Sequence, residues 1–327
     1  MNLNLKSLCE KFIQNRDIIK ENFAWDNSLI YPACAMIFVD KNSTANTDNL
    51  KSCKTILKQN TGIFSNFRAN TRIPVISMMS LSHDPVERIQ NTLAFYNVLK
   101  KYFWNSEYLA LGALILSNMI ELDQYDFIAM KASNIYKAIK KIHPFLTSSE
   151  DAVFCLLLAA SDKTEDEILA YTEECYVLLK PHFFSPNAVQ ALSHALTLQN
   201  GSSKDKCNKV MTLFDNLKQN GYKYGTNFEL ASLGLLATLD VDRKELIENF
   251  GAVNGYLKQQ KGYSLFGTIA SQRYVHTTMI LLKYYGSDTD TSSATFMDTA
   301  MSIVIAQEIA LVTMIIASSV VNSTVHN

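Results

Sequence analysis

Two arginines stand four residues apart in the segment Asn66-Phe-Arg-Ala-Asn-Thr-Arg72, and the chain contains only six arginines. Arg68 and Arg72, with the amide of Asn70 between them, have the residue types of a clamp for an anion or a carboxylate. Guanidinium groups suit such ligands because they donate two parallel hydrogen bonds. Alternatively, the arginines form salt bridges between neighbouring helical hairpins. Both interpretations stay open, and the three residues are candidate binding residues.

A second polar group interrupts an otherwise apolar helix near the C-terminus. Gln272, Arg273 and His276 are spaced so that they can share one side of a helix. They are candidate binding residues, or they belong to the core and pair with Glu308. Because an unpaired buried carboxylate is costly, Glu308 is expected to have a partner, and Arg273 or His276 is the candidate.

Motifs for catalysis or cofactor binding are absent from the sequence. There is no phosphate-binding glycine loop, no nucleophile elbow, no H-E-x-x-H pair and no Cys/His set at zinc spacing. We therefore expect no metal and no cofactor, and catalytic residues remain unknown. Four acidic residues at predicted helix starts suit either acid–base chemistry or a favourable place at the positive end of a helix dipole: Glu107, Glu150, Asp151 and Glu229.

The composition favours helices. Among 327 residues, 30 Lys+Arg balance 31 Asp+Glu to give a net charge of −1, which argues against a basic surface for nucleic acid. Hydrophobic residues make up 48%, whereas there are only 11 Gly and 6 Pro, so turns are too few for a many-stranded β fold. The six cysteines are far apart, as is typical of reduced, buried thiols in a cytoplasmic protein.

An internal repeat organises the chain. Ile89, Ile168 and Ile247 lie 79 residues apart, each in a helix that follows an apolar helix end and an acidic start. Each repeat divides into two hairpins that pair a small-residue-rich apolar helix with an amphipathic one, which predicts an all-α array of about seven antiparallel hairpins, as an α-solenoid or α/α toroid.

We predict a single helical-repeat domain over residues 1–327. Its parts are an N-terminal helix at 1–21, repeat units of four helices at 22–102, 103–182 and 183–262, and a partial unit at 263–327. Local signals mark helix starts, among them Asp84-Pro85 and a capping box that begins at Ser161 or Asp162 with Glu165.

The segment 300–321 is long and apolar enough to be considered as a membrane span, with Glu308 its one charged residue. The charge and several polar residues offset the gain from its Ile, Val and Leu residues, so insertion is near neutral. We therefore expect a helix surrounded by protein, which can also join two copies of the chain, and we regard membrane association as the weaker alternative.

The whole chain resembles the bacterial family catalogued as domain of unknown function 4003. The resemblance rests on the chain length, on Phe67-Arg-Ala-Asn-Thr-Arg72 before an apolar helix, on the helix starts at Asp84-Pro85 and Ser161-Asp162, and on the ending Ile305-Ala-Gln-Glu-Ile-Ala-Leu. It implies no activity, cofactor or catalytic residue.

Two function classes follow from these observations. The first is a soluble cytoplasmic helical-repeat protein that binds a protein or peptide near Arg68 and Arg72. The second is an enzyme with a small-molecule pocket in a toroid, lined by acids and by aromatic residues such as Trp25, Trp104 or Phe184. Whether any catalysis occurs is an open question at this point.

Overall fold

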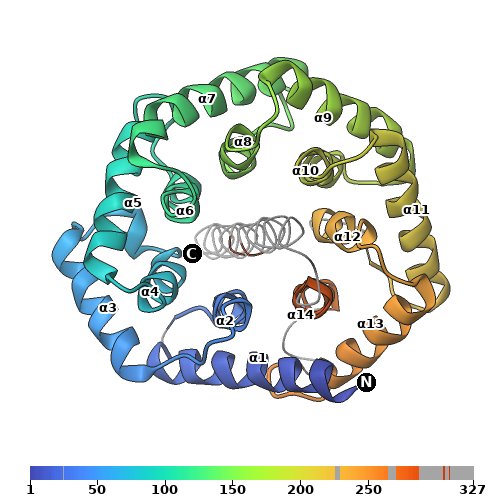
Figure 1. Ribbon diagram of the computed structural model, residues 1–327, viewed down its shortest axis with the longest axis horizontal. Helices are drawn as coiled ribbons and strands as arrows, with labels where there is room; N and C mark the ends of the chain where they lie inside the picture. The colour runs from blue at the N-terminus through green and yellow to red at the C-terminus, as the bar shows by residue number, and fades with distance from the viewer. Residues whose placement is uncertain (25, 225–228, 264–269, 287–304, 306–308, 310–327) are drawn as a thin grey trace, which may run out of the picture. The chain divides into compact units, whose positions relative to one another are not determined.

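The computed structural model describes residues 1–24, 26–224, 229–263, 270–286, 305 and 309, and every regular element in them is helical (Figure 1). The predicted all-α class is confirmed. The segment 300–321, including Glu308, lies outside the described residues except for Ile305 and Ile309, which are buried.

The chain forms two compact units. Unit 1 contains residues 1–10 and 127–304, and unit 2 contains residues 11–126 and 305–327, each as far as it is described. Helix α1 (Leu3–Asn22) and helix α7 (Tyr125–Ile142) cross the boundaries between them. The predicted single domain stays a prediction, and each unit is described by itself.

Unit 2 alternates apolar and amphipathic helices. In chain order its elements are η1 (Ser28–Ile30), α2 (Tyr31–Asp40), α3 (Thr47–Asn60), η2 (Asn66–Arg68), α4 (Arg72–Ser80), α5 (Pro85–Leu99), α6 (Glu107–Leu116) and η3 (Leu122–Gln124). The apolar helix α2 packs on α4, and the amphipathic helix α3 packs on α5. An apolar helix needs neighbours around it because it cannot bury all of its faces alone.

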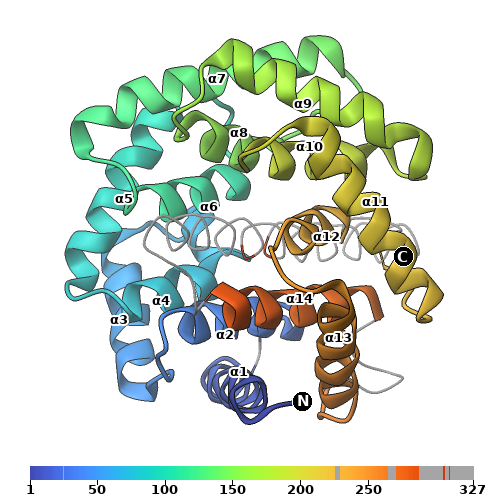
Figure 2. The ribbon, with the colours of Figure 1, turned by 45° about the vertical axis from the view of Figure 1, so that its right-hand side comes forward.

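Unit 1 continues the alternation. After α7 come α8 (Asp151–Ala159), α9 (Glu165–Leu179), η4 (Lys180–His182), α10 (Pro186–Thr197), α11 (Ser203–Gln219), α12 (Leu230–Ala237), α13 (Arg243–Lys258) and α14 (Ala270–Gly286). Helices α8, α10, α12 and α14 pack one on the next, and α9, α11 and α13 line one side of them (Figures 1 and 2). All nine residues of α8 are buried.

One glycine lies where two apolar helices pack closely. A Cβ atom on Gly234 of α12 would lie 2.3 Å from Cδ1 of Leu192 in α10. Real Cβ atoms do not approach other atoms that closely, so a larger residue there would require the Leu192 side chain to shift.

The predicted helix starts are partly correct. Asp84 caps α5 ahead of Pro85 as expected, with its carboxylate accepting from the amides of Val86 and Glu87. The capping box of α9 was predicted from the wrong residue: it is formed by Thr164 and Glu167, one turn after Ser161. Helices α4, α8 and α12 begin at Arg72, Asp151 and Leu230, so their starts are 79 residues apart.

Buried lysines donate hydrogen bonds to backbone carbonyl groups at or just after the C-terminal ends of two apolar helices. Lys131 donates to the carbonyl oxygens of Ser161 and Lys163 after α8, at 3.1 and 2.7 Å, and Lys206 donates to those of Leu196 and Gln199 at the end of α10. A cation there satisfies carbonyl groups that have no partner within the helix and complements the helix dipole. Lys131 belongs to a basic helix face that suggests solvent exposure, yet it is 8% exposed.

Candidate functional site

The predicted clamp residues surround the start of α4 in unit 2, but each has its own partner. Arg72 forms an ion pair with Asp26, and Arg68 donates to the carbonyl oxygen of Thr61 at 3.3 Å. The backbone N–H of Asn70 donates to a carboxylate oxygen of Glu107 at 3.2 Å. The pair with Asp26 matches the salt-bridge interpretation of Arg72. Whether an anion also binds here stays a prediction.

Hydrogen bonds join the loop before α4 to the loop before α6. The amide nitrogen of Asn66 donates to the hydroxyl of Tyr96 at 2.8 Å and to the side-chain oxygen of Asn105 at 3.0 Å. Tyr96 also donates to Asn105, and its ring meets buried Phe67 edge-on, with centroids 4.9 Å apart. The two loops are therefore held side by side on a fixed base.

Three large hydrophobic side chains stand on this base in solvent. Ile63 is 77% exposed, Phe64 is 100% exposed, and Trp104 is 96% exposed. We call Ile63, Phe64 and Trp104 the unit 2 aromatic patch. Phe67 anchors the loop in the core, whereas Phe64, three residues earlier, points away from it. These exposed apolar side chains make the two loops a candidate contact surface.

Glu107 links the loop that carries Trp104 to the loop before α4, through its bond from Asn70. It is half-buried at the start of α6, and burial raises its pKa while the bonds from Asn70 oppose that rise. Of the other three predicted helix-start acids, Asp151 and Glu229 are buried in unit 1 and Glu150 is partly exposed there. Glu150 and Asp151 place carboxylates at the start of α8, and Glu229 places one at the start of α12. The helix dipole favours a negative charge at these positions.

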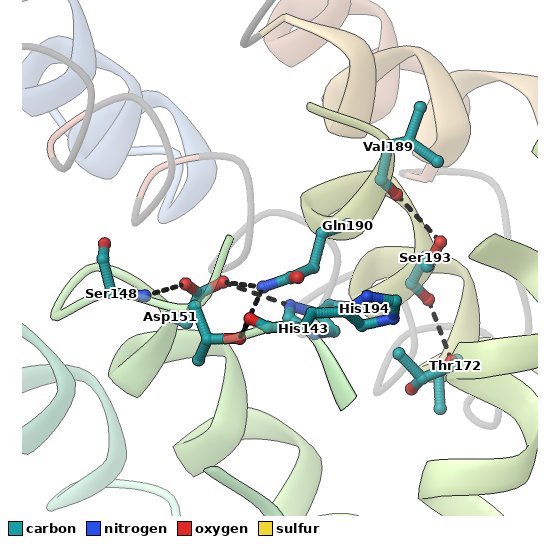
Figure 3. A network of polar contacts seen from close by, with 10 residues as sticks. His143, Ser148, Asp151, Thr172, Val189, Gln190, Ser193 and His194 are labelled. Atoms are coloured by element: carbon teal, nitrogen blue, oxygen red, sulfur yellow. Dashed lines mark hydrogen bonds and ion pairs between the residues drawn. The ribbon is translucent and has the colours of Figure 1, made fainter. Parts of the chain in front are cut away.

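Unit 1 contains a buried polar cluster around Asp151 at the start of α8 (Figure 3). One carboxylate oxygen of Asp151 accepts the backbone N–H of Ser148 at 2.8 Å, and the other accepts the side-chain amide of Gln190 at 3.1 Å. The same Gln190 amide reaches the hydroxyl of Thr147 at 3.4 Å. Burial raises the pKa of Asp151 to about 6, although the two bonds act in the opposite direction.

His194 of α10 faces this carboxyl without a hydrogen bond to it. Its Nδ1 lies 3.7 Å from Asp151 Oδ1, and neither ring nitrogen has a hydrogen-bond partner among the described residues. Burial and, second, the charge of His143 lower the pKa of His194 to about 3, so the ring stays neutral. The side chain is fully buried, as its apolar surroundings suggest, but its hydrogen-bonding capacity is unused.

The second predicted group lies on α14 and has partners from neighbouring segments of unit 1. Arg273 donates to the side-chain oxygen of Asn254 at 2.8 Å, and Nδ1 of His276 lies 2.7 Å from the hydroxyl of Tyr263. Gln272 is 2% exposed and His276 is 1% exposed. Glu308 lies outside the described residues, so the predicted pairing with Arg273 or His276 stays a prediction.

A family model described as "Protein of unknown function (DUF4003)" matches residues 15–310. The chain belongs to this family. Over 149 residues it is also 28% identical to "Uncharacterized protein YeaA" of Bacillus subtilis (strain 168), a match that covers 44% of this chain and 45% of that protein. The matched segment thus covers less than half of the length of that relative. No solved structure matches it.

The residues matched by the family model, 15–310, include Phe64 and Trp104 of the unit 2 aromatic patch. They also include Asp151 and His194 of the buried cluster in unit 1. In the described part of this DUF4003 chain, no three His, Cys, Asp or Glu side chains gather to hold a metal, and no helix has the length and apolarity of a membrane span. All six cysteines are buried thiols, as predicted.

Trp104 was considered only as a pocket residue and Ile63 and Phe64 were missed, although the sequence holds a signal for the exposed aromatic residues. Phe64, Trp104, Phe145 and Phe184 recur about every 40 residues, each in the turn before an apolar helix, which is the spacing of one hairpin. Each of the four is at least 96% exposed. A residue that stays hydrophobic at a polar turn position in successive hairpins is the pattern to look for in other DUF4003 chains.

Proposed function

We propose that this DUF4003 protein is a helical-repeat binding protein that recognises a protein or peptide through the unit 2 aromatic patch. The observation that carries the proposal is the exposure of Ile63, Phe64 and Trp104 on two loops that are hydrogen-bonded to each other. Aromatic side chains presented by a rigid base are typical centres of protein interfaces, because little conformational entropy is lost when they are covered.

The surroundings of the patch favour a peptide that combines apolar and acidic residues. Lys100 is exposed at the end of α5, Lys101 beside it pairs with Asp126 at 3.4 Å, and Arg68 is partly exposed beside the other loop. Complementary charges next to an apolar centre raise the rate and the specificity of association. Asn66 and Asn105 add amide groups that suit the polar backbone of a peptide.

We further propose that the hairpins of both units belong to one array of about seven, an α-solenoid or α/α toroid, acting in the cytoplasm. The alternating layers inside each unit and the helix starts 79 residues apart support this architecture. The enzyme alternative has less support at Asp151 and His194, because these two residues are 6% and 0% exposed.

Peptide selection tests the proposed function. A displayed library of random peptides is selected on the full chain, and enriched sequences are synthesised and titrated while tryptophan emission is recorded. The titration uses the Trp25→Phe variant, in which Trp104 is the remaining tryptophan. We expect enriched peptides to contain acidic and large apolar residues, and the emission of Trp104 to shift to the blue as its ring leaves water.

The matched variants are Phe64→Ser/Trp104→Ser and, at equally exposed positions in unit 1, Phe145→Ser/Phe184→Ser. The first pair should weaken peptide binding about tenfold or more, since such anchors dominate interfaces, whereas the second pair should leave it unchanged. Selected peptides that bind both variants as tightly as the unaltered chain would contradict the proposal.

A further inference from the structure

A different surface stands out in unit 1, where two amphipathic helices end together. Asn134 of α7 bonds Glu165 at the start of α9, and His143, just after α7, bonds Glu173 farther along α9, at 3.2 and 2.8 Å. Since these contacts advance in the same direction along both helices, α7 and α9 run parallel. Their C-terminal ends and the loops that follow them therefore lie on one edge of the unit.

Large hydrophobic side chains are exposed along this edge. Ile142, the last residue of α7, is 49% exposed, and Phe145 in the following loop is 96% exposed. Val177 and Leu178 near the end of α9 are 59% and 36% exposed, and Phe184 in the next loop is 98% exposed. We call these five residues the unit 1 edge. Monomeric proteins rarely gather so many exposed apolar side chains without a contact that covers them.

Lysines outnumber acidic residues around this edge. Lys140, Lys141 and Lys180 are exposed there. The segments 137–149 and 173–187, which build the edge, contain four lysines and two glutamates. Of these glutamates, Glu173 is bonded to His143 and Glu174 is exposed. The other acids of α9, Glu165, Asp166 and Glu167, form its first turn at the opposite end. The edge therefore has a small excess of positive charge.

We propose that the unit 1 edge binds the surface of an anionic lipid bilayer, with Phe145 and Phe184 inserted among the lipid headgroups. Aromatic and aliphatic side chains flanked by lysines are the composition of interfacial membrane anchors, because the rings enter the headgroup layer while the ammonium groups meet lipid phosphates. This is peripheral binding, distinct from a membrane span at 300–321.

The chemistry of the edge favours lipid over a second protein. The unit 2 aromatic patch stands among amides that can address a peptide backbone, whereas the exposed loops of the unit 1 edge carry Pro144 and Pro181 beside the phenylalanines. A proline has no backbone N–H to donate. Hydrophobic contact and charge, the two terms that a bilayer surface supplies, are what this edge offers.

Vesicle flotation with the full chain tests the proposal. Vesicles of phosphatidylcholine with phosphatidylglycerol are compared with vesicles of phosphatidylcholine alone, at low and high salt. We expect the chain to float with the anionic vesicles, to bind the neutral ones at least about tenfold more weakly, and to be released by salt, since three lysines contribute electrostatically.

Two double variants locate the surface. Phe145→Ser/Phe184→Ser should lower binding to anionic vesicles about tenfold or more, while Phe64→Ser/Trp104→Ser, equally exposed in unit 2, should leave it unchanged. Both pairs replace side chains outside the core, and thermal unfolding followed by circular dichroism checks that the fold is retained. A third variant, Lys140→Gln/Lys141→Gln, should weaken binding and its salt dependence together.

Three outcomes would overturn the proposal. The chain fails to float with anionic vesicles, or Phe145→Ser/Phe184→Ser floats as well as the unaltered chain, or neutral vesicles are bound equally well. If vesicle binding is absent and the same variant abolishes a dimer seen by analytical ultracentrifugation, the edge is an interface between two copies of the chain.

Discussion

Helices α4 and α8 begin 79 residues apart in the repeat, at Arg72 and Asp151, yet their entrances have opposite chemistry. Arg72 is about one-third exposed and pairs with Asp26. Asp151 is 6% exposed and is held by hydrogen bonds from neutral donors, with an unprotonated imidazole beside it. The comparison shows that the helices begin at equivalent positions of the repeat. The neighbouring segments determine whether the charged residue at that position is exposed and paired with an opposite charge, or is buried among neutral groups.

Exchanging the residue types should have the largest effect at the buried entrance. Asp151→Arg places an unpaired cation in the core and should lower the free energy of unfolding by more than about 3 kcal/mol. Arg72→Asp puts a like charge beside Asp26 in partial solvent and should cost about 1 kcal/mol. Denaturant unfolding measures both. Losses of the same size at the two entrances would mean that their environments do not differ as described.

Neutralising Asp151 should stabilise the chain in a pH-dependent way. The unfolded carboxyl ionises near pH 3.8 and the folded one near pH 6, so the cost of burying the ionised form grows between these values and persists above them. Asp151→Asn should therefore gain up to about 3 kcal/mol at pH 7.5 and nothing at pH 4. Denaturant unfolding at the two pH values measures the gain, and a pH-independent effect would refute the assignment.

Replacing His194 should give the opposite pH trend. The folded imidazole stays neutral down to about pH 3, whereas the unfolded one is protonated below its usual value of 6.5, so the fold loses stability as the pH falls through that range. His194→Leu removes this loss and two unpartnered nitrogens. It should stabilise by about 1 kcal/mol at pH 7.5 and by more at pH 4.5. Unfolding curves in which the gain shrinks on acidification would contradict the prediction.

Removing Arg72 should have the smallest effect. An ion pair at this exposure contributes under about 1 kcal/mol and is screened by salt, so Arg72→Ala should cost less than that and less still at high salt. A double-mutant cycle with Asp26→Ala isolates the interaction. A loss that salt does not reduce would indicate that Arg72 has a role beyond its ion pair.

The helices and their spacing could be predicted from the sequence, because apolar periodicity and caps act over a few residues. The partner of Arg72 could not, since Asp26 is 46 residues earlier in the chain. Nor could the contrast between buried Phe67 and exposed Phe64, which lie in a turn where no periodicity separates core from solvent. The helix dipole explains why an acidic residue such as Asp151 stands at a helix start. Its burial could not be predicted, because it depends on Gln190 and His194 of another helix.

One crossed experiment tests most directly the central claim, that a helical-repeat protein presents a peptide-binding patch on unit 2. The unaltered chain, Phe64→Ser/Trp104→Ser and Phe145→Ser/Phe184→Ser are each titrated with a selected peptide and with anionic vesicles. The first variant is predicted to lose peptide binding about tenfold or more and keep vesicle binding, and the second to do the reverse. Peptide binding that survives Phe64→Ser/Trp104→Ser, or falls equally in both variants, would contradict the claim.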